Sequence, residues 1–358
     1  KVDAERLAVA VEPAAAAPQR IDAPRAVVRF MVEVTDPRLG ETVLDPASGT
    51  GGFLVEAYSY LEKQVKTVAD RKRLQEETIT GCEPKSLPYL LCQMNLLLHG
   101  LDAPQIDPGN ALRFKLSEIG EKERVDVILT NPPFGTKKGG GLPTRTDFTY
   151  PTSNKQFCFL QHIYRGLKPG GRAAVVLPDN VLFEGNVGKQ IRTDLMDKCS
   201  LHTILRLPTG IFYAQGVKTN VLFFTRGEKD KGNTKEVWVY DLRANMPQFG
   251  KRTVLTRAHF AEFEAAFGKD PLGAPKSLKK RKDTGETGRF RRFTREQIAE
   301  RGDSLDIAWL KDDNDTDGRE LPEPTFLARA ALLELDGAMA ELRGILEELG
   351  EDVEEMEA

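Results

Sequence analysis

The chain has 358 residues, of which 40% are hydrophobic and 29% are charged, a composition typical of globular proteins with a core of their own. Its length exceeds one average domain, so we expect a large α/β domain with an appendage. No apolar stretch approaches the length of a membrane span and no signal peptide is apparent, which argues against a membrane or secreted protein. We therefore expect a cytoplasmic protein.

The thiols and imidazoles do not form a recognisable metal site. The four cysteines stand far apart without a C-x-x-C pair, and the four histidines are equally scattered. We expect reduced, mostly buried thiols and no bound metal.

Charge is distributed unevenly along the chain. From Lys311 onward there are 16 Asp and Glu against 4 Lys and Arg, a local charge of −12, so residues 1–310 carry +9 of the net −3. A basic body with an acidic tail suits a nucleic-acid ligand on one part and a protein partner on the other. Two solvated faces of opposite sign would explain the same charges.

Residues 1–23 are rich in Ala and Pro and are interpreted as a linker or a remnant of another domain. After them, helical patterns alternate with short apolar runs. The expected helices cover 24–34, 53–68, 87–98 and 156–167, and the expected strands cover 41–45, 78–83, a short stretch before Gly109, 125–130 and 172–177. This alternation predicts a doubly wound, mostly parallel, Rossmann-like α/β sheet of order 3-2-1-4-5, in which the first and fourth strands are neighbours.

The remainder of the chain predicts additions to this sheet. Residues 217–225 and 236–242 are expected to pair as a hairpin at one edge, and residues 24–265 to form the main domain. Residues 266–300 are basic and are interpreted as a mobile loop that either contacts phosphates or is simply solvated. The segment 301–358 is expected to be helical, because Leu residues and one Met recur in a 3-4-3-4-3 rhythm at positions 332, 335, 339, 342, 346 and 349. A helix with so narrow an apolar stripe usually packs on another helix.

The strand at 125–130 ends in Asn131-Pro132-Pro133-Phe134. Each proline lacks an N–H and fixes its φ angle, so the strand must stop there in a rigid loop. The loop carries one amide side chain and one aromatic ring, which suits the binding of a planar base by its exocyclic amine. An ordinary strand-ending turn is the alternative.

The strand at 41–45 ends in Asp45, followed by Pro46-Ala47-Ser48-Gly49-Thr50-Gly51-Gly52 and the helix beginning near Phe53. This turn lacks the G-x-G-x-x-G spacing of dinucleotide sites and the G-K-[ST] of a P-loop. An acid at the strand end repels phosphate but suits a cationic ligand that carries an amino acid, such as S-adenosylmethionine. Glu83, at the next strand end, could accept hydrogen bonds from ribose hydroxyls. Asn110, followed by Ala111, could recognise an adenine edge.

Taken in order, these motifs carry a family resemblance. The segments D-P-A-S-G-T-G-G-F-L, G-C-E-P and N-P-P-F, with the later L-P-T-G-I-F and G-V-K-T-N-V-L-F-F, resemble N6-adenine DNA methyltransferases. More closely, the chain from Pro24 to Leu349 resembles the modification subunit of type I restriction–modification systems. The family has an aromatic-rich segment before its Pro-Arg, whereas this chain has Arg20-Ile21-Asp22-Ala23 there. Asn110 stands where an Asp is more usual.

The resemblance implies an enzyme that transfers a methyl group from S-adenosylmethionine to N6 of an adenine flipped out of the duplex. It implies donor contacts from Pro24, Arg25, residues 45–53, Glu83, Asn110 and Ala111, and catalysis by residues 131–134. Phe134 and Phe212 would form the two walls around the base, although Phe212 could equally be a core residue. The implied partners are double-stranded DNA, a specificity subunit bound through the 332–349 helix, a restriction subunit and a second copy of this chain.

Two other readings stay open at this point. The N-P-P-F loop also suits enzymes that methylate cytosine N4, the amino group of guanine in RNA, or a glutamine amide in protein, because all are planar acceptors. The second alternative is a non-catalytic scaffold that binds the donor or DNA within a complex.

Overall fold

The computed structural model describes residues 23–115, 118–134, 147–211, 218–247, 249–250 and 253–311. The described residues lie in a compact unit that ends at Lys311, ten residues beyond the domain boundary expected at 301. The difference has a physical cause, because Leu305 and Ile307 are buried in the core of this unit. The predicted linker up to residue 22, Phe212 and the predicted 332–349 helix lie outside the described residues.

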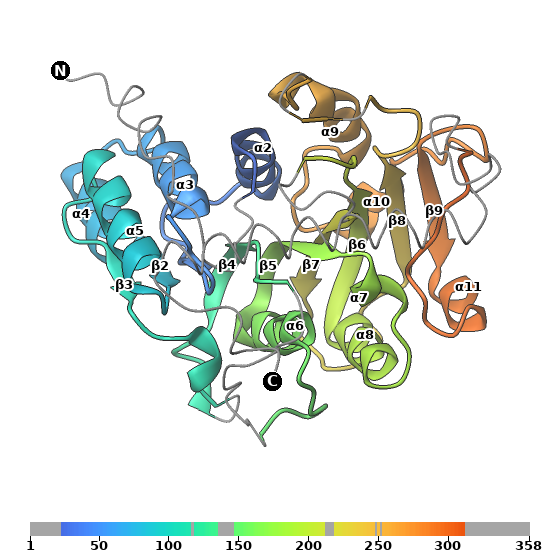
Figure 1. Ribbon diagram of the computed structural model, residues 1–358, viewed down its shortest axis with the longest axis horizontal. Coiled ribbons are helices and arrows are strands. Elements are labelled where there is room, and N and C mark those ends of the chain that lie inside the picture. The colour runs from blue at the N-terminus through green and yellow to red at the C-terminus, as the bar shows by residue number, and fades with distance from the viewer. Residues whose placement is uncertain are drawn as a thin grey trace, which may run out of the picture. The chain divides into compact units, whose positions relative to one another are not determined.

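The first half of the chain follows the expected alternation (Figure 1). Its elements are α2 (Arg25–Thr35), β1 (Val43–Asp45), α3 (Gly52–Glu62), α4 (Val68–Arg73), η1 (Leu74–Thr78), β2 (Ile79–Cys82), α5 (Ser86–Leu98), β3 (Gln105–Asp107), η2 (Ala111–Arg113), β4 (Val125–Thr130), α6 (Lys155–Gly166) and β5 (Leu167–Pro178).

The second half adds more structure than the sequence predicts. Its elements are α7 (Asn180–Phe183), α8 (Val187–Lys198), β6 (Cys199–Arg206), β7 (Thr219–Arg226), β8 (Glu236–Asp241), η4 (Arg257–Phe260), α9 (Ala261–Phe267), α10 (Pro275–Leu278), β9 (Phe290–Thr294) and α11 (Arg295–Glu300).

The strands of the described residues form one nine-stranded sheet of order β3-β2-β1-β4-β5-β7-β6-β8-β9. The first five positions confirm the predicted order, and β1 pairs in parallel with both β2 and β4. Strand β7 runs antiparallel to its neighbours β5 and β6, and β9 runs antiparallel to β8. The carboxyl ends of the parallel strands therefore share one edge of the sheet with the beginnings of β7 and β9. We call this the carboxyl edge.

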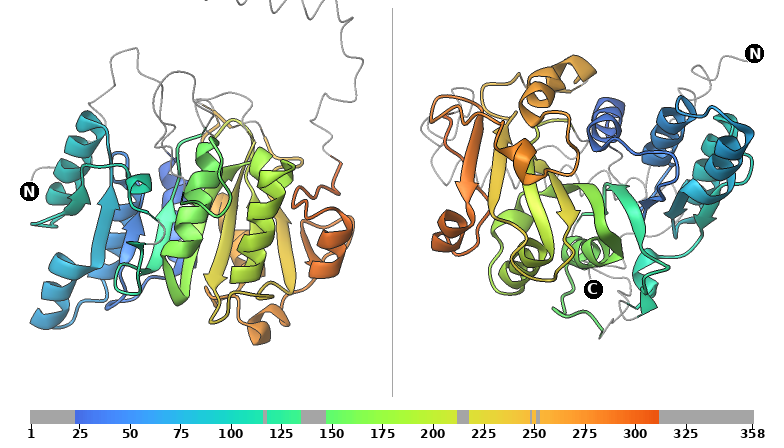
Figure 2. Two further views of the ribbon diagram at one scale, coloured as in Figure 1. Left: turned by 90° about the horizontal axis from the view of Figure 1, so that it is seen from below. Right: turned by 180° about the vertical axis from the view of Figure 1, so that it is seen from behind.

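Helices cover both faces of the sheet. One core cluster joins α2, α3, α5 and α9 to one face, and the other joins α6, α7, α8 and α11 to the opposite face. Figure 1 shows α2 and α9 above the sheet and α6 and α8 below it, and Figure 2 shows α6 and α8 lying along the strands. Such two-sided cover explains why the central strands read as continuous apolar runs.

The end of α2 is fixed to the sheet by a buried arginine. The helix stops at Asp36, which has a positive φ of 49° and precedes Pro37. Arg172 of β5 donates to the carbonyl oxygens of Thr35 and Asp36, each at 2.7 Å, and pairs with Glu41 at 2.8 Å. One guanidinium thus satisfies carbonyls that the helix itself leaves unpaired.

The expected hairpin is wrong, although both of its strands exist. Residues 217–225 and 236–242 correspond to β7 and β8, but β6 lies between them and pairs with both. The outermost strands on this side of the sheet are instead β8 and β9. They pair along five residues each, with Glu236 opposite Thr294 and Tyr240 opposite Phe290.

The expected basic loop at 266–300 is also wrong. The segment contains α10, β9 and α11, and its buried residues include Arg281 and Phe290. The Arg281 guanidinium donates to the Phe267 carbonyl oxygen at 3.1 Å and to Thr203 Oγ1 at 2.8 Å, and it lies over the Phe267 ring. The ring of Phe290 packs in the core beside Trp238 and Tyr240. At least one basic residue of this segment, Arg281, therefore stabilises the fold and is not solvated at the surface.

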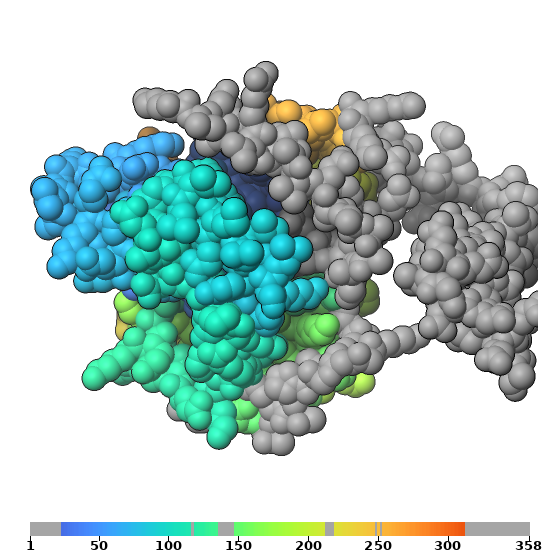
Figure 3. All heavy atoms as spheres, turned by 60° about the vertical axis from the view of Figure 1, so that its left-hand side comes forward, coloured from blue at the N-terminus to red at the C-terminus, as the bar shows by residue number. Residues whose placement is uncertain are grey.

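Helix α5 forms where it is expected and is followed by Gly100, which has a φ of 95°. Its apolar stripe is not core, however. Figure 3 shows the face of the molecule to which α5 belongs. The buried side chains of the helix are Cys92 and Leu96, whereas five others are 49 to 64% exposed, namely Leu87, Leu90, Met94, Leu97 and Leu98.

None of the described helices combines the length and the apolar character that crossing a bilayer requires.

Replacing Arg172 with Met should lower the free energy of unfolding by about 3 kcal/mol, because two carbonyl groups and the Glu41 carboxylate lose their shared donor. Urea denaturation followed by circular dichroism measures this. Arg38→Met is the control, since Arg38 pairs with Asp36 in the same turn but its side chain is 64% exposed. A loss below about 1 kcal/mol is expected for it. Equal losses for the two variants would contradict the assignment.

Candidate functional site

The turn after β1 is organised by Asp45, whose side chain is 1% exposed. Its Oδ1 accepts a hydrogen bond from the Ala47 N–H at 3.0 Å, and Ser48 Oγ donates to the Asp45 carbonyl oxygen at 2.9 Å. Gly51 then has a φ of 85° and precedes α3, with Cys92 of α5 so close that a Cβ would lie 2.8 Å from its sulfur. The glycine here is required both by the left-handed backbone and by the packing of α5.

The same aspartate links this turn to the next motif in space. Thr130, the last residue of β4, donates from Oγ1 to Asp45 Oδ1 at 2.6 Å. Asn131-Pro132-Pro133-Phe134 follows directly. The turn after β1 and the loop after β4 are therefore held side by side at the carboxyl edge, where the sequence predicts that a crevice opens. We call them the donor loop (45–53) and the acceptor loop (131–134).

Glu83 joins the donor loop from the other side. It follows β2, is 1% exposed, and accepts hydrogen bonds from the Gly49 N–H at 2.9 Å and the Lys85 N–H at 3.0 Å. The preceding strand packs so tightly on the loop that a Cβ on Gly81 would lie 2.3 Å from Ser48 Oγ. Carboxylates thus lie at the ends of two neighbouring strands, as predicted, and both accept hydrogen bonds from the backbone of the loop.

The remaining predicted donor contacts lie at the starts of helices. Asn110 follows β3, and its Oδ1 caps the short helix η2 by accepting from the Leu112 N–H at 3.0 Å, while Ala111 is buried. Pro24 and the exposed Arg25 begin α2, which packs with α3 in one core cluster. Phe53 is a core residue of that same cluster. The carboxyl edge therefore collects the donor loop, Glu83 and Asn110.

The acceptor loop combines buried and accessible groups. Asn131 is 9% exposed and Pro132 is buried, whereas Pro133 and Phe134 are half-buried. Phe134 packs against the core cluster that contains α2 and α3. The amide is consequently fixed by its surroundings, and the ring keeps part of its surface accessible.

The thiol of Cys82, which directly precedes Glu83, is held in its protonated form. Burial, reinforced by the negative charges of Asp107 and Asp45, raises the pKa of Cys82 to about 12. The four cysteines are free and buried. Among the described residues, no group of three His, Cys, Asp or Glu side chains could hold a metal ion.

Sequence reasoning missed the polar groups that support this edge. Thr130 could have been found, because it ends a strand predicted to lie beside Asp45. Asp179 after β5 forms a further polar cluster with the buried Asn220 at the start of β7 and the buried Arg243 after β8, and no local pattern marks it.

Residues 20–316 match the N-6 DNA Methylase family. The methylase subunit of the type I restriction enzyme StySPI from Salmonella potsdam is 47% identical over 360 residues, which cover 91% of this chain and 68% of that protein. The EcoKI methylase subunit from Escherichia coli (strain K12) is similar to the same extent. The crystal structure of the EcoKI M protein has a TM-score of 0.72 and 43% identity, covering 93% of this chain and 74% of that one.

Replacing Thr130 with Val keeps the shape of the side chain but deprives the buried Asp45 carboxylate of a donor. The free energy of unfolding should fall by about 2 kcal/mol, as for other hydrogen bonds to charged groups. Thr130→Ser should restore most of it. Thr80→Val on β2 is the control, because there the hydroxyl donates to the neutral Val43 carbonyl of β1 at 3.2 Å, and a loss of about 1 kcal/mol is expected. Chemical denaturation compares them, and losses of the same size would count against a special role of Thr130.

Proposed function

The chain belongs to the N-6 DNA methylase family, and from this premise we propose that it methylates adenine N6 in double-stranded DNA as the modification subunit of a type I restriction–modification complex. One observation carries the proposal beyond family membership. The Thr130 to Asp45 hydrogen bond joins the donor loop to the acceptor loop, so a methyl donor and a target base would occupy adjoining sites.

The residues at the donor loop fit S-adenosylmethionine. Asp45 and Glu83 put two buried carboxylates beside a glycine turn, which disfavours phosphate and suits a ligand with an ammonium group and ribose hydroxyls. A Cβ on Gly52 would have no neighbour within 4 Å, so the start of α3 leaves open space. Pro24, Arg25, residues 45–53, Glu83, Asn110 and Ala111 would hold the ligand. When bound, it supplies an electrophilic methyl group on a sulfonium.

The acceptor loop supplies hydrogen-bond acceptors for an exocyclic amine. The lone pair of adenine N6 is conjugated into the ring, so the amine is a poor nucleophile. In the proposed mechanism the Asn131 side-chain oxygen and the Pro132 carbonyl oxygen accept the two N6 hydrogens, which frees the lone pair. Positive charge then develops on nitrogen, and these two dipoles would stabilise it. No side-chain base is needed at the start, because the proton leaves after the transfer.

A duplex hides N6, so the base must first be flipped out at a cost of a few kcal/mol. Stacking of the flipped base on the partly accessible ring of Phe134 can offset this cost by about 1–3 kcal/mol. Phe212 stays the predicted second wall. Among the planar acceptors compatible with N-P-P-F, adenine in DNA is favoured because the relatives are methylase subunits of type I restriction enzymes.

Target recognition is assigned to a separate specificity subunit. In this proposal its helices pack against the segment after Lys311, chiefly on the 332–349 stripe, and a restriction subunit and a second copy of this chain complete the assembly. The support is the family and the apolar rhythm of the sequence.

Asn131→Ala should reduce the rate of methyl transfer by about 100-fold or more, because a fixed dipole aimed at the developing charge is lost. Tritium transfer from labelled S-adenosylmethionine to unmethylated duplex DNA measures the rate, and calorimetry should show unchanged donor affinity. Asn233→Ala is the control, since its amide donates to two carbonyl oxygens at the opposite edge of the sheet and should affect stability alone. Full activity of Asn131→Ala would refute the mechanism.

Deleting residues 325–358 should release a co-expressed specificity subunit while leaving S-adenosylmethionine affinity unchanged, because the deleted segment follows the unit that carries the donor loop. Co-purification on a tag placed on the specificity subunit, together with calorimetry on the truncated chain, tests both parts. Continued co-purification would contradict the assignment of the partner surface.

A further inference from the structure

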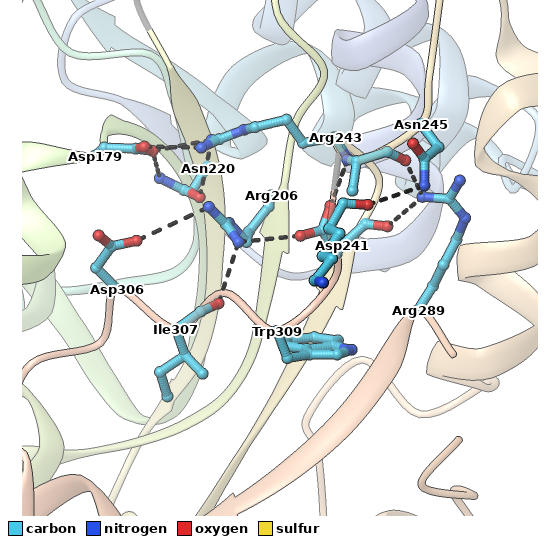
Figure 4. Close-up of polar contacts among 12 residues, drawn as sticks. Asp179, Arg206, Asn220, Asp241, Arg243, Asn245, Arg289, Asp306, Ile307 and Trp309 are labelled. Atoms are coloured by element: carbon cyan, nitrogen blue, oxygen red, sulfur yellow. Dashed lines mark hydrogen bonds and ion pairs between the residues drawn. The ribbon is translucent and has the colours of Figure 1, made fainter. Parts of the chain in front are cut away.

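A single arginine, Arg243, joins four strand ends at the carboxyl edge, and Figure 4 shows its side chain pointing toward Asp179. Arg243 follows β8 and is 7% exposed. Its Nε donates to the Leu207 carbonyl oxygen at 3.0 Å, just after β6, and its Nη2 donates to the Thr219 carbonyl oxygen at 2.9 Å, where β7 begins. The same guanidinium pairs in bidentate fashion with Asp179, just after β5, at 2.7 and 2.9 Å.

Asp179 extends this cluster into the backbone. Its N–H donates to the Lys218 carbonyl oxygen at 3.0 Å, and its Oδ1 also accepts from Asn220 Nδ2 at 2.7 Å. Burial acts to raise the pKa of the Asp179 carboxyl, but the hydrogen bonds and charge of Arg243 outweigh burial and hold that pKa below its ordinary value. Asn220 is fully buried, so its place in the V-K-T-N run is explained by this contact.

The cluster controls where the chain leaves and rejoins the sheet. Leu207 and Thr219 are also linked directly, by a hydrogen bond from the Leu207 N–H to the Thr219 carbonyl oxygen at 3.0 Å. The described residues after Leu207 continue to Ile211, which packs against the same core cluster as Phe134 of the acceptor loop. Strand β5, which ends at the cluster, is also the neighbour of β4, which ends at the acceptor loop.

We propose that Arg243 is a positioning residue for methyl transfer: by holding the Leu207 and Thr219 carbonyl groups and Asp179 together, it fixes residues 207–211 at the carboxyl edge, where the acceptor loop also lies. The inference rests on the proposed function for the reaction it serves. Arg243 touches no reacting atom in this scheme. It acts through the backbone on the side of the site that receives the base.

The guanidinium geometry is essential to this role. Arg presents a planar fork that reaches the two carbonyls and both carboxylate oxygens at once, whereas Lys offers a single point charge. Arg243→Lys therefore keeps the charge beside Asp179 and loses the simultaneous bridge. Misplacement by about 1 Å near a reacting group can cost about 100-fold in rate.

The structure offers a matched control on β7, one of the strands that Arg243 joins. Arg226 ends β7 at the opposite edge of the sheet, is 8% exposed, donates to the Lys198 carbonyl oxygen at 2.6 Å and pairs with Asp230. Arg226→Lys removes a similar buried guanidinium at the far end of β7. A purely structural role for Arg243 predicts that the two variants behave alike.

The full-length chain, co-purified with its specificity partner, is assayed with tritiated S-adenosylmethionine and unmethylated duplex DNA. For Arg243→Lys we expect kcat to fall about 10- to 100-fold, a higher KM for DNA and a donor Kd within about twofold of wild type. For Arg226→Lys we expect a comparable loss in Tm with kcat within about twofold. The proposal would be overturned if kcat fell by the same factor in both variants and only in proportion to the fraction of protein that is folded.

A second readout does not depend on methylation. Hydrogen exchange followed by mass spectrometry should be faster in Arg243→Lys at residues 207–211 and 218–220, and unchanged in the donor loop. Unchanged exchange at residues 207–211 and 218–220 would overturn the role of Arg243, whether or not the wild-type chain methylates DNA. Absence of methyl transfer by the wild-type chain would instead refute the proposed function. Faster exchange with full methyl transfer also overturns the role of Arg243.

Asp179→Asn serves if Arg243→Lys does not fold. The asparagine keeps an acceptor oxygen but loses the charge. We therefore expect a smaller fall in kcat than for Arg243→Lys and a smaller increase in hydrogen exchange at residues 207–211 and 218–220. Because the pKa of Asp179 is lowered, wild type should keep the stabilisation of the pair above about pH 4 and lose it as the pH falls further. Asp179→Asn should lack this acid-dependent step, and an identical acid profile in both proteins would contradict the assigned pair.

Discussion

The hydrogen bond from Thr130 to Asp45 is the contact on which the arrangement of the site depends. A carboxylate that is 1% exposed is costly to bury unless donors surround it, and Asp45 finds them in the Ala47 backbone and in the last side chain of β4. The parallel pairing of β1 with β4 makes this possible, because their carboxyl ends lie together at the switch point of the sheet. The hydrogen bond that satisfies this buried charge therefore also holds the donor loop against the end of β4, where the acceptor loop begins.

The other half of the carboxyl edge is built on the same physical rule with the charges exchanged. There, buried arginines are satisfied by aspartates and carbonyl groups. Arg206 pairs with Asp241 at 3.0 Å and donates to the Ile307 carbonyl oxygen at 3.2 Å, and Asn245 donates to the Lys311 carbonyl oxygen (Figure 4). The chain therefore returns to this edge at Lys311, just before the residues that we propose bind a partner. Removing one member of such a network leaves a buried charge or carbonyl unpaired, so the edge behaves as one unit.

The elements that the sequence predicts well are those whose signals are local. The strand at 125–130 matches β4 residue for residue, because an apolar run ends at two prolines. Pairing is not local, which is why the 217–225 and 236–242 strands were expected to pair with each other. The strand that separates them, β6, includes His202 and Thr203, and these polar residues hide its burial. Likewise, the pattern of α5 predicts a helix but not which face is covered, since Leu87 and Leu98 are exposed.

The same distinction separates the parts of the site that the sequence predicts from those it does not. Asp45, Glu83 and Asn131 follow strands whose ends are visible as changes in composition, and parallel topology then places them at one edge. Arg243 and Asp179 are 64 residues apart, and their meeting requires β6 and β7 to lie between β5 and β8. No spacing rule along the chain encodes that order. Groups that would touch ligands are thus found from motifs, whereas the groups that hold them in place emerge only once the pairing of distant strands is known.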